Sequence, residues 1–477
     1  VKIRHGNIDV ARADADVVID EVYELGTQDP AFLGPESGLA MPVGDDGVEL
    51  YVSSQHLHHD QPQIAASLDL PLEKVRLVLS GVGGAFGGKE DLNVHIHACL
   101  LALRTGRPVR MVYNREESFF GHVHRHPATA RVELGATHDG KILFSKVRLV
   151  LDGGAYASQS PRVIGNGSFF AGGAYDVPNV QIDGYATYTN NPPCGAMRGF
   201  GLVQSIYAIE SAVDRLAREL DMDPLELRMK NALAEGDLLP TGQAIDGPAP
   251  LQEILSYVRD LPLPDAADPA SPDPRSRPGG LGNTTHGEGV RRGTGYALGI
   301  KAIGFSGGAD DTSPARVTMW ISDGGPVAGV YCAAAEIGQG IVAVETQIVR
   351  TELGVERVLM PDKDTDIADP GATSASRQTW MTAGSVVAAC ELVREELLER
   401  AATMLGDSVA ELELCGPSIC EAATGRPLVD VADVLGESTI SHEYTYHHRK
   451  TWPIDEETGQ GDAHPAFAYV VHRAVVD

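Results

Sequence analysis

A glycine-rich segment of the chain ends in a lysine and a glutamate, residue types that hold and polarise a ligand. Residues 81–88 contain five glycines, and Lys89 and Glu90 follow them directly. Glycine has no Cβ, so the backbone N–H groups of such a loop approach a ligand closely. Converging N–H groups ahead of a helix N-terminus favour a phosphate, an oxyanion or a metal–oxo group. A tight structural turn is the alternative interpretation.

Two familiar phosphate-binding patterns do not match this segment. In the P-loop pattern G-x-x-x-x-G-K-[ST], Gly83, Gly88 and Lys89 are in place, but Glu90 stands where the Mg²⁺-binding hydroxyl belongs. A carboxylate at that position would repel a triphosphate. In the dinucleotide pattern G-x-G-x-x-G, the third glycine position holds Phe86. The aromatic residue and the Lys-Glu pair therefore indicate a different ligand.

The elements around this loop are a strand and a helix. Residues 75–79 form an apolar run that predicts a strand, and residues 109–112 predict the next one. Between them, apolar residues recur at helical spacing, at Leu92, Ile96, Cys99 and Leu103. Gly106 and Pro108 end this pattern. The sequence therefore predicts a strand, a glycine loop, a helix and a second strand, with the loop at the helix N-terminus.

Three other segments share this small-residue, loop-forming character. They are residues 195–201 (GAMRGFG), 336–340 (EIGQG) and 373–379 (TSASRQT), and helical patterns follow the last two. Arg198 stands among small residues, and its planar guanidinium suits contacts with phosphate or oxo groups; a structural salt bridge is the other interpretation. Backbone donors at two helix N-termini, opposite the first two loops, predict one extended anionic ligand between two domains.

Composition and charge exclude several classes of protein. The chain has 477 residues, 43% of them hydrophobic, with a formal net charge of −28 and an isoelectric point near 4.9. Such acidity argues against a nucleic-acid partner, because phosphate contacts require clustered lysine and arginine. The apolar runs are far shorter than the roughly 20 residues of a membrane span, and the first residues lack the apolar region of a signal peptide.

The cysteines give a further constraint on cofactors and compartment. There are six of them, and they are dispersed without a CxxC pair. Neither a zinc ribbon nor an iron–sulfur signature is therefore predicted in this chain. Buried or free thiols in a reducing compartment are the simplest interpretation, and we expect a cytoplasmic protein.

Histidines crowd the first part of the chain, at positions 56, 58, 59, 95, 97, 122, 124 and 126. In the segment HVHRH, His122, His124 and His126 alternate, so a strand would place all three on one face. A zinc site is one interpretation. Ordinary surface or core histidines are the other, because no H-E-x-x-H motif and no obvious carboxylate partner recur nearby.

Breaks in the pattern predict the domain organisation. Residues 1–260 form a first domain, residues 261–285 a linker rich in proline and aspartate, and residues 286–477 a second domain. Residues 156–174 are rich in glycine, serine and aromatic residues, which predicts a long irregular segment of the kind that lines binding sites. Asp223, followed by Pro and then Glu at the third helical position, predicts a helix start.

Four motifs occur in one order along the chain: GGAFGGKE, GAMRGFG, EIGQG and TSASRQT. With VSSQ before the first, RTGRPVRMVYNREES after it and DPLELRMKNAL after the second, the set resembles the molybdenum-cofactor subunit of the xanthine dehydrogenase (xanthine oxidase) family. The resemblance spans nearly the whole chain and points to the bacterial group in which this subunit is separate. It implies a mixed α/β (α+β) fold, in which glycine-rich loops of two large molybdopterin-binding domains converge on the cofactor.

The resemblance implies cofactor contacts at positions that match the family's motifs. Gln55 would lie near the apical oxo ligand of molybdenum, Phe86 would present its backbone N–H group to the metal's ligands, and Arg198 would lie beside the metal. The full expected set is Gln55, Gly84, Phe86, Gly87, Arg198, Gly338, Gln339, Gly340, Ala375, Ser376, Arg377 and Gln378. Gln55, Phe86, Arg198 and Ala375 are expected nearest the metal. In bacteria the pterin is often a cytosine dinucleotide.

The resemblance also implies a substrate wall. Glu90 matches the substrate-side glutamate of GGKE and would hydrogen-bond ring nitrogens, while Phe200 would stack on a flat ring. Phe305 and Ser306 match the opposite wall. The xanthine enzymes of the family carry an arginine where this chain has Asn166. That difference leaves other purines and other N-heterocycles open as substrates.

The implied activity is oxidative hydroxylation of an electron-poor carbon in an N-heterocycle of the hypoxanthine or xanthine class. Electrons would pass to [2Fe–2S] and FAD-binding partner subunits, in a dimer of heterotrimers or a similar assembly. The family's general base is a glutamate beyond the segment FAYVVHRAVVD, where this sequence stops, so we expect it outside this chain. The start without an initiator Met predicts a missing N-terminal part.

Several alternatives stay open at this point. An aldehyde oxidoreductase of the same family is one, although Glu90 argues against it. Carbon monoxide dehydrogenases carry a cysteine in the loop that matches GAMRGFG, whereas Cys194 precedes that loop in this chain. A zinc hydrolase built on the histidine-rich half belongs to a different class. A scaffold without catalytic activity is the last alternative, because no general base is identified.

Overall fold

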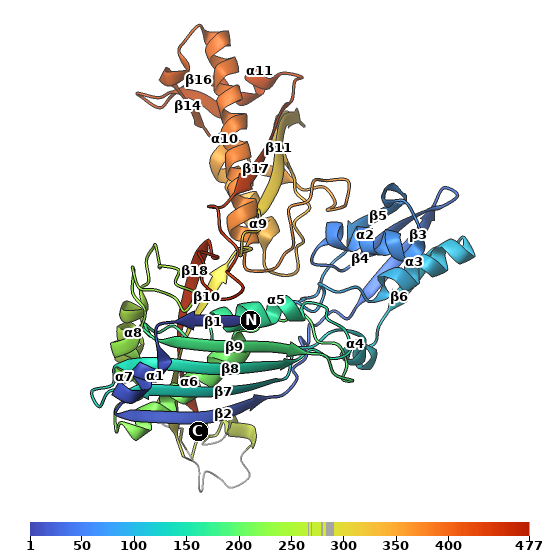
Figure 1. The fold of residues 1–477 in the computed structure, drawn as a ribbon. Coiled ribbons are helices and arrows are strands. Elements are labelled where there is room, and N and C mark those ends of the chain that lie inside the picture. The colour runs from blue at the N-terminus through green and yellow to red at the C-terminus, as the bar shows by residue number, and fades with distance from the viewer. Residues whose placement is uncertain (266, 269, 278–279, 283–290, 477) are drawn as a thin grey trace.

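The computed structural model describes residues 1–265, 267–268, 270–277, 280–282 and 291–476. The chain forms a lower body, a smaller lobe of residues 37–112 and an elongated upper lobe from the second half (Figure 1). Helices and strands intermingle along the sequence, which confirms the predicted mixed α/β class. Among the described residues, no helix is both long and apolar enough to cross a membrane.

Helices and strands alternate along both halves of the chain. Up to residue 260 they are β1 (Lys2–His5), α1 (Ile8–Asp14), β2 (Val17–Leu25), β3 (Ser37–Val43), β4 (Gly47–Val52), α2 (Leu57–Leu68), η1 (Leu72–Lys74), β5 (Val75–Leu79), α3 (Val94–Thr105), β6 (Val109–Val112), α4 (Arg115–Gly121), β7 (Ala128–Ala136), β8 (Ile142–Asp152), α5 (Ser160–Phe169), β9 (Val180–Thr187), α6 (Leu202–Glu219), α7 (Pro224–Asn231) and α8 (Leu251–Asp260). Beyond residue 260 they are η2 (Pro274–Ser276), η3 (Gly280–Gly282), β10 (Gly293–Ile303), β11 (Thr312–Ser322), β12 (Gly325–Tyr331), α9 (Ile341–Leu353), β13 (Arg357–Leu359), α10 (Gln378–Leu405), η4 (Val409–Glu411), β14 (Leu412–Cys415), β15 (Ser418–Glu421), β16 (Arg426–Asp430), α11 (Val431–Leu435), β17 (Ile440–His447) and β18 (Ala466–Val476).

The lower body is built on a five-stranded sheet with the order β1-β9-β8-β7-β2. The pair β8–β9 is parallel and the other pairs are antiparallel. Helix α6 covers this sheet, and its Ile209, Val213 and Leu216 are buried in the same core as strand residues of β7 and β8. Their spacing of four and three residues explains why one face of the helix is apolar. Helix α7 begins as predicted, because the Asp223 side chain accepts hydrogen bonds from two backbone N–H groups of its first turn.

The lobe of residues 37–112 carries the glycine loop. Its sheet has the order β5-β4-β3-β6, and α2 and α3 pack beside it. β5 and β6 have the predicted bounds, and α3 ends where Gly106 adopts a φ of 63°. A left-handed residue at this position is typical of a helix C-terminus. The predicted order of strand, glycine loop, helix and strand is therefore confirmed.

The upper lobe contains the four-stranded sheet β13-β12-β11-β17, covered by α9 and α10. Val386, Ala389, Val393 and Leu397 of α10 are buried against it. A small sheet, β14-β15-β16, lies at the far end of α10 (Figure 1). The N-terminal ends of α9 and α10, which carry the third and fourth loops, point back toward the other lobes.

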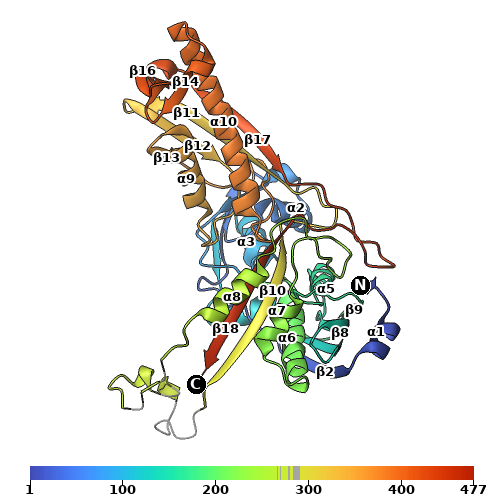
Figure 2. The same ribbon diagram turned by 90° about the vertical axis from the view of Figure 1, so that its left-hand side faces the viewer.

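Two strands from beyond residue 290 belong to the lower body. β10 and β18 pair along eleven residues each, and Figure 2 shows them running beside α6 and α8. Leu298, Ile300 and Ala302 of β10 are buried in the same core as α6. The predicted second domain of residues 286–477 thus contributes an arm to the core of the first. Residues 283–290, at the predicted boundary, lie outside the described residues.

One prediction about local structure is wrong. The composition of residues 156–174 predicts an irregular segment, yet it contains α5, a helix of ten residues. Glycine and serine are weak helix formers, so its sequence, SPRVIGNGSF, carries little local signal. Val163 and Ile164 are buried in the core of the lower body, and tertiary packing stabilises this helix. Asn166 therefore projects from a helix rather than from a loop.

Candidate functional site

The side chain of Gln55 joins the glycine loop to the fourth loop. Its Oε1 accepts hydrogen bonds from the backbone N–H groups of Gly87 at 3.0 Å and Lys89 at 3.3 Å. Its Nε2 donates to the carbonyl oxygen of Thr373 at 2.8 Å. The backbone N–H of Thr373 in turn donates to the carbonyl oxygen of Gln55 at 2.9 Å. Gln55 is 2% exposed, so these contacts satisfy a buried amide and fix two loops from different lobes.

The glycine loop also contacts the loop of residues 195–201. The backbone N–H of Arg198 donates to the carbonyl oxygen of Phe86 at 2.7 Å. Phe86 has a φ of 54°, which is uncommon for a residue with a side chain. A Cβ on Gly87 would lie 2.9 Å from backbone atoms of Ala196 and Met197. The two loops therefore touch through their backbones, and only glycine fits at residue 87.

Arg198 itself lies exposed beside this contact. Its guanidinium has no hydrogen bond or ion pair to any residue that the structure describes. The alternative interpretation, an arginine held in a salt bridge, is therefore not what the described part of the chain shows. An unpaired guanidinium is suited to an anionic ligand.

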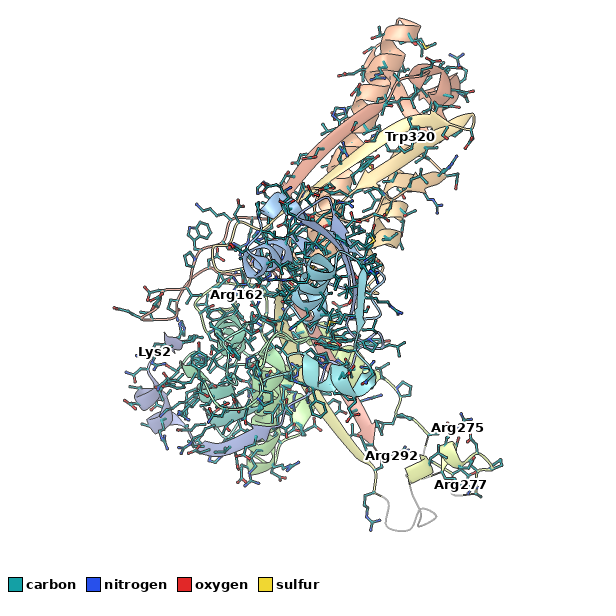
Figure 3. All side chains as sticks on the ribbon, turned by 90° about the vertical axis from the view of Figure 1, so that its right-hand side faces the viewer. Lys2, Arg162, Arg275, Arg277, Arg292 and Trp320 are labelled. Carbon is teal, nitrogen blue, oxygen red and sulfur yellow. The ribbon has the colours of Figure 1, made fainter. Side chains whose placement is uncertain are left out.

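Glu90 follows the glycine loop and is half-buried. Desolvation, together with the charge of Asp91, raises the pKa of its carboxyl group to about 7, although the charges of His59 and Arg162 act to lower it. Its Oε1 accepts a hydrogen bond of 3.4 Å from the side-chain amide of Gln55. Figure 3 shows where Arg162 lies, on α5. A carboxyl group poised near neutral pH is able to exchange or donate a proton.

Asn166 and Phe200 are neighbours. The side-chain Nδ2 of Asn166 donates to the backbone carbonyl oxygen of Phe200 at 2.6 Å. Phe200 has a φ of 49°, and its N–H donates to the carbonyl oxygen of Met197 at 2.7 Å. The Asn166 amide nitrogen therefore holds the second loop in shape. A direct contact of Asn166 with substrate stays a prediction.

The fourth loop contains two consecutive left-handed residues, Ala375 at φ 49° and Ser376 at φ 55°. Next to them, Arg377 is fully buried, and its guanidinium forms an ion pair with Asp311 at 2.5 Å. The same group donates to the carbonyl oxygens of Pro370 at 2.7 Å, Ala372 at 3.3 Å and Thr312 at 2.7 Å. The Arg377 side chain is thus used entirely to shape this loop. Any contact of Arg377 with a cofactor would have to come from its backbone.

Gln378 has a similar internal role. Its Nε2 donates to the carbonyl oxygens of Gly371 and Ala372, each at 3.1 Å. Its Oε1 accepts a hydrogen bond from the hydroxyl of Thr382. The side chain of Gln378 therefore closes the turn ahead of α10, and its predicted cofactor contact is untested.

The third loop is organised by Glu336. Its carboxylate accepts hydrogen bonds from the backbone N–H groups of Gly338 at 2.8 Å, Gly340 at 3.1 Å and Val342 at 3.2 Å. Burial tends to raise the pKa of Glu336, but these hydrogen bonds outweigh it and hold the pKa below its usual value. The Gln339 amide closes the loop by donating to the carbonyl oxygen of Ala335 at 2.9 Å.

Phe305 and Ser306 lie next to the fourth loop. The backbone N–H of Phe305 donates to Asp311 Oδ2 at 2.9 Å, and the Arg377 guanidinium lies 4.9 Å from the Phe305 ring centre. The N–H of Gly304 donates to the carbonyl oxygen of Ala375 at 3.0 Å. Asp311 therefore connects Phe305, predicted to contact the substrate, with Arg377 of the fourth loop.

Three residues that organise the site were not singled out from the sequence. Thr373 and Glu336 lie inside recognised motifs, but their roles depend on contacts that the motif letters do not show. Nothing in the sequence around Asp311 indicates its role. Arg377 is distant in the sequence, and Phe305 contacts Asp311 through its backbone N–H.

The loops as built fit an extended anionic cofactor. Arg198 offers an unpaired cation, and the exposed ring of Phe86 lies on the loop that Arg198 contacts. At Gly338 and Gly340, with φ of 108° and 86°, an added Cβ would meet no atom within 4 Å. The third loop therefore leaves room for a ligand to approach its backbone closely, while the N–H groups of Gly338 and Gly340 donate to Glu336. A molybdenum-bearing pterin with phosphate groups is an anion of the kind that the Arg198 guanidinium suits.

Comparison with known proteins supports the same conclusion. Residues 1–232 and residues 277–477 each match a family model described as a molybdopterin cofactor-binding domain. The chain is 34% identical over 446 residues to a probable xanthine dehydrogenase subunit of Bacillus subtilis, covering 93% of this chain and 57% of that protein. It is 38% identical over 258 residues to the nicotinate dehydrogenase large molybdopterin subunit of Eubacterium barkeri, covering 54% of this chain and 61% of that protein.

The fold also matches a solved structure. The aldehyde oxidoreductase from Desulfovibrio gigas superimposes with a TM-score of 0.78 at 26% identity, covering 99% of this chain and 48% of that one. The chain spans less than two thirds of the length of each of these relatives. Both family matches, the curated relatives and the converging loops agree with the resemblance seen in the sequence motifs. The chain belongs to the molybdenum-cofactor-binding proteins of the xanthine dehydrogenase family.

Proposed function

We propose that this chain is the molybdenum-cofactor subunit of a hydroxylase that oxidises an electron-poor carbon in an N-heterocycle of the purine type. The observation that carries the proposal is Glu90, a carboxyl group at the end of the glycine loop whose pKa is raised to about 7 by desolvation. Such a group donates or accepts a hydrogen bond at a ring nitrogen. By sharing its proton with that nitrogen, it stabilises the negative charge that develops on the ring during the reaction. An aldehyde offers no ring nitrogen for this contact.

Other residues of the chain have the proposed roles of binding the cofactor and orienting the substrate. Arg198 would hold the cofactor, Gln55 and Gly87 would position it through the loops that they join, and the backbone of residues 338–340 and 375–376 would line its extended part. Bound molybdenum supplies two-electron redox chemistry and Lewis acidity. Phe200, Phe305 and Ser306 orient a flat substrate, and Glu90 holds a proton at the ring. Asn166 keeps the Phe200 loop in place.

The names of similar proteins support an N-heterocyclic substrate. One is named a nicotinate dehydrogenase subunit, and others from Escherichia coli are named probable hypoxanthine oxidase. Nicotinate and hypoxanthine both contain ring nitrogens beside electron-poor carbons. We therefore propose an N-heterocycle as the class of substrate for this chain, and we propose no particular compound.

The cofactor form and the partners are part of the proposal. Molybdopterin is supported by both domain matches, and we propose the cytosine dinucleotide form. Because the six cysteines form no cluster motif, we propose that [2Fe–2S] and FAD-binding subunits receive the electrons, in a cytoplasmic dimer of heterotrimers or a similar assembly.

An aldehyde oxidoreductase is the second candidate, favoured by the structural match to the Desulfovibrio gigas enzyme. The test compares turnover of hypoxanthine, xanthine, nicotinate and an aromatic aldehyde by the purified molybdenum-loaded complex, with an artificial electron acceptor. Faster turnover of at least one N-heterocycle supports the proposal. Turnover of the aldehyde alone would replace it with the second candidate.

A further inference from the structure

Part of the histidine-rich segment converges on a carboxylate away from Glu90. His122 and His124 lie on one face of the extended segment 122–126, with ring centres 5.2 Å apart. The Nε2 atom of each lies 3.1 Å from Oδ2 of Asp29. One ligand atom from each of the three residues lies within 4.8 Å of the others. The third histidine, His126, instead contacts the hydroxyl of Ser160 at 2.7 Å, so it is not part of this cluster.

These close contacts are not aligned as hydrogen bonds. Asp29 Oδ2 and both ring nitrogens of His122 are buried without a hydrogen-bond partner among the described residues. The His122 side chain is only 1% exposed. Buried polar atoms that lack partners are rare in folded proteins. Unpartnered nitrogen and carboxylate oxygen atoms this close together are suited to binding one ion.

A second carboxylate lies beside the other ring nitrogen of His122. Glu36 is 1% exposed, and its Oε1 lies 2.7 Å from Nδ1 of His122, on the side of the ring away from Asp29. Metal-ligating histidines commonly face a carboxylate with the nitrogen that does not bind the metal. With a proton on Nδ1, Nε2 presents a lone pair toward a carboxylate oxygen of Asp29. Two such acceptors repel each other unless a cation lies between them.

An ordinary histidine–carboxylate pair elsewhere in the chain looks different. His442 Nε2 and Glu396 Oε2 are 2.6 Å apart and form an aligned hydrogen bond, and both side chains are 32% exposed. That pair needs no ion to satisfy it. The contrast separates the Asp29 cluster from a simple ion pair.

The cluster lies next to the glycine loop of residues 81–88. Asp29 and Glu36 belong to the segment of residues 28–36, whose Gly34 donates its N–H to the carbonyl oxygen of Gly83 at 3.0 Å. Lys89 donates to the carbonyl oxygen of Gly34 at 2.8 Å. On the other side, the carbonyl oxygen of His124 accepts a hydrogen bond from Gly195 at 3.0 Å. An ion at this position would tie the segment of residues 28–36 to the first two loops.

We propose that Asp29, His122 and His124 bind one divalent transition-metal ion of the zinc class, with Glu36 orienting His122. Two imidazoles and a carboxylate are ligands that Zn²⁺ favours, and water would complete a tetrahedral site. Tetrahedral ligands at about 2.0–2.2 Å from zinc lie about 3.3–3.6 Å apart, close to the 3.1 Å between Asp29 Oδ2 and the Nε2 atom of each histidine. The ion would have a structural role: it would hold the segment of residues 28–36, and through that segment the glycine loop, in place.

The test measures zinc on the full chain, purified without a histidine tag. The chain is stripped with a chelator and dialysed, and Zn²⁺ is returned in competition with a chromophoric chelator. One equivalent should bind, and Co²⁺ in its place should give the intense visible bands of a tetrahedral ion. Asp29→Asn and His124→Gln should each weaken zinc binding more than 100-fold, and Glu36→Gln by about 10–100-fold.

His442→Gln is the matched control, and it should bind zinc as tightly as the original chain. Circular dichroism of each variant reports whether it has folded. Because the stripped and reloaded original chain is itself measured, a misfolded variant does not decide the question. Absence of stoichiometric zinc on the original chain, or unchanged zinc affinity in folded His124→Gln, overturns the proposal. Neither result depends on molybdenum or on turnover, so the proposed activity stands or falls separately.

Discussion

Gln55 and Thr373 are joined by two hydrogen bonds across 318 residues of sequence, one through the Gln55 side chain at 2.8 Å and one between their backbones at 2.9 Å. The same side chain accepts the N–H of Gly87. A single buried amide therefore sets the position of the glycine loop relative to the loop ahead of α10. The distance between the two halves of the cofactor site depends on this residue.

We expect Gln55→Leu to lower molybdenum content and stability together. The leucine leaves the N–H of Gly87 and the carbonyl of Thr373 without their partner, at a cost of about 1–3 kcal/mol. Metal analysis and thermal unfolding measure the two effects. Gln61→Leu is the matched control, because Gln61 also donates to a backbone carbonyl, that of Val75, but at a partly exposed position away from the loops. Equal molybdenum content in the Gln55 and Gln61 variants would contradict this role.

Exchanging Glu90 for Gln should reduce turnover by roughly 10²- to 10⁴-fold, the range of a lost proton-transfer group. The amide keeps the shape of the side chain but no longer exchanges a proton with a ring nitrogen. Molybdenum content should stay near that of the original protein, because the backbone contacts of the loop are unchanged. Steady-state kinetics and metal analysis of the same preparation check both statements. Unchanged turnover would remove Glu90 from its assigned substrate role.

The same substitution gives a stability test that needs no substrate. The pKa of Glu90 rises from 4.5 to about 7 on folding, chiefly through desolvation. Between these values the unfolded chain releases the proton while the native chain keeps it, so this contribution to stability falls as pH rises through the window. The free energy of unfolding of the original protein, relative to Glu90→Gln, should therefore decline from pH 5 to pH 8. Parallel pH profiles of the two proteins would show that burial does not shift this pKa.

Asp311→Asn should destabilise the chain by about 3–5 kcal/mol, because it leaves the fully buried guanidinium of Arg377 without its counter-charge. Denaturant unfolding followed by circular dichroism measures the loss. Asp323→Asn is the control, because its ion pair with Arg357 is exposed, with side chains 50% and 79% accessible, and such pairs contribute about 0–1 kcal/mol. Similar losses in the two variants would mean that Arg377 finds other partners.

Local signals in the sequence predicted the glycine-rich loop and several of the regular elements. The glycine segment, the strand at 75–79 and the start of α7 follow from residue types at short range, and the structure has them as expected. The ordered motifs carried the family resemblance for the same reason. A motif can be recognised from the sequence alone because its residues are adjacent in the chain.

What the sequence did not reveal depends on contacts between distant segments. Helix α5 has a weak local pattern and is stabilised by the core around Val163. The pairing of β10 with β18 and their packing on the lower body join segments that are far apart in the chain, which periodicity does not encode. Likewise, the family resemblance implied a cofactor contact for Arg377, and only the position of Asp311 shows how the Arg377 side chain is used.

Gly87 offers the sharpest test of the contact between the first two loops. Gly87→Ala should lower both molybdenum content and activity, because φ is +98° and the new Cβ would lie 2.9 Å from the backbone of Ala196 and Met197. The left-handed conformation alone costs about 1–2 kcal/mol, and the crowding adds to it by pushing the loops apart. Gly106→Ala separates the two causes, because Gly106 also has a positive φ, +63°, but meets no atom within 4 Å. The Gly106 variant should lose some stability and keep its molybdenum. If the Gly87 variant behaves like the Gly106 variant, contact between the loops does not control the cofactor site.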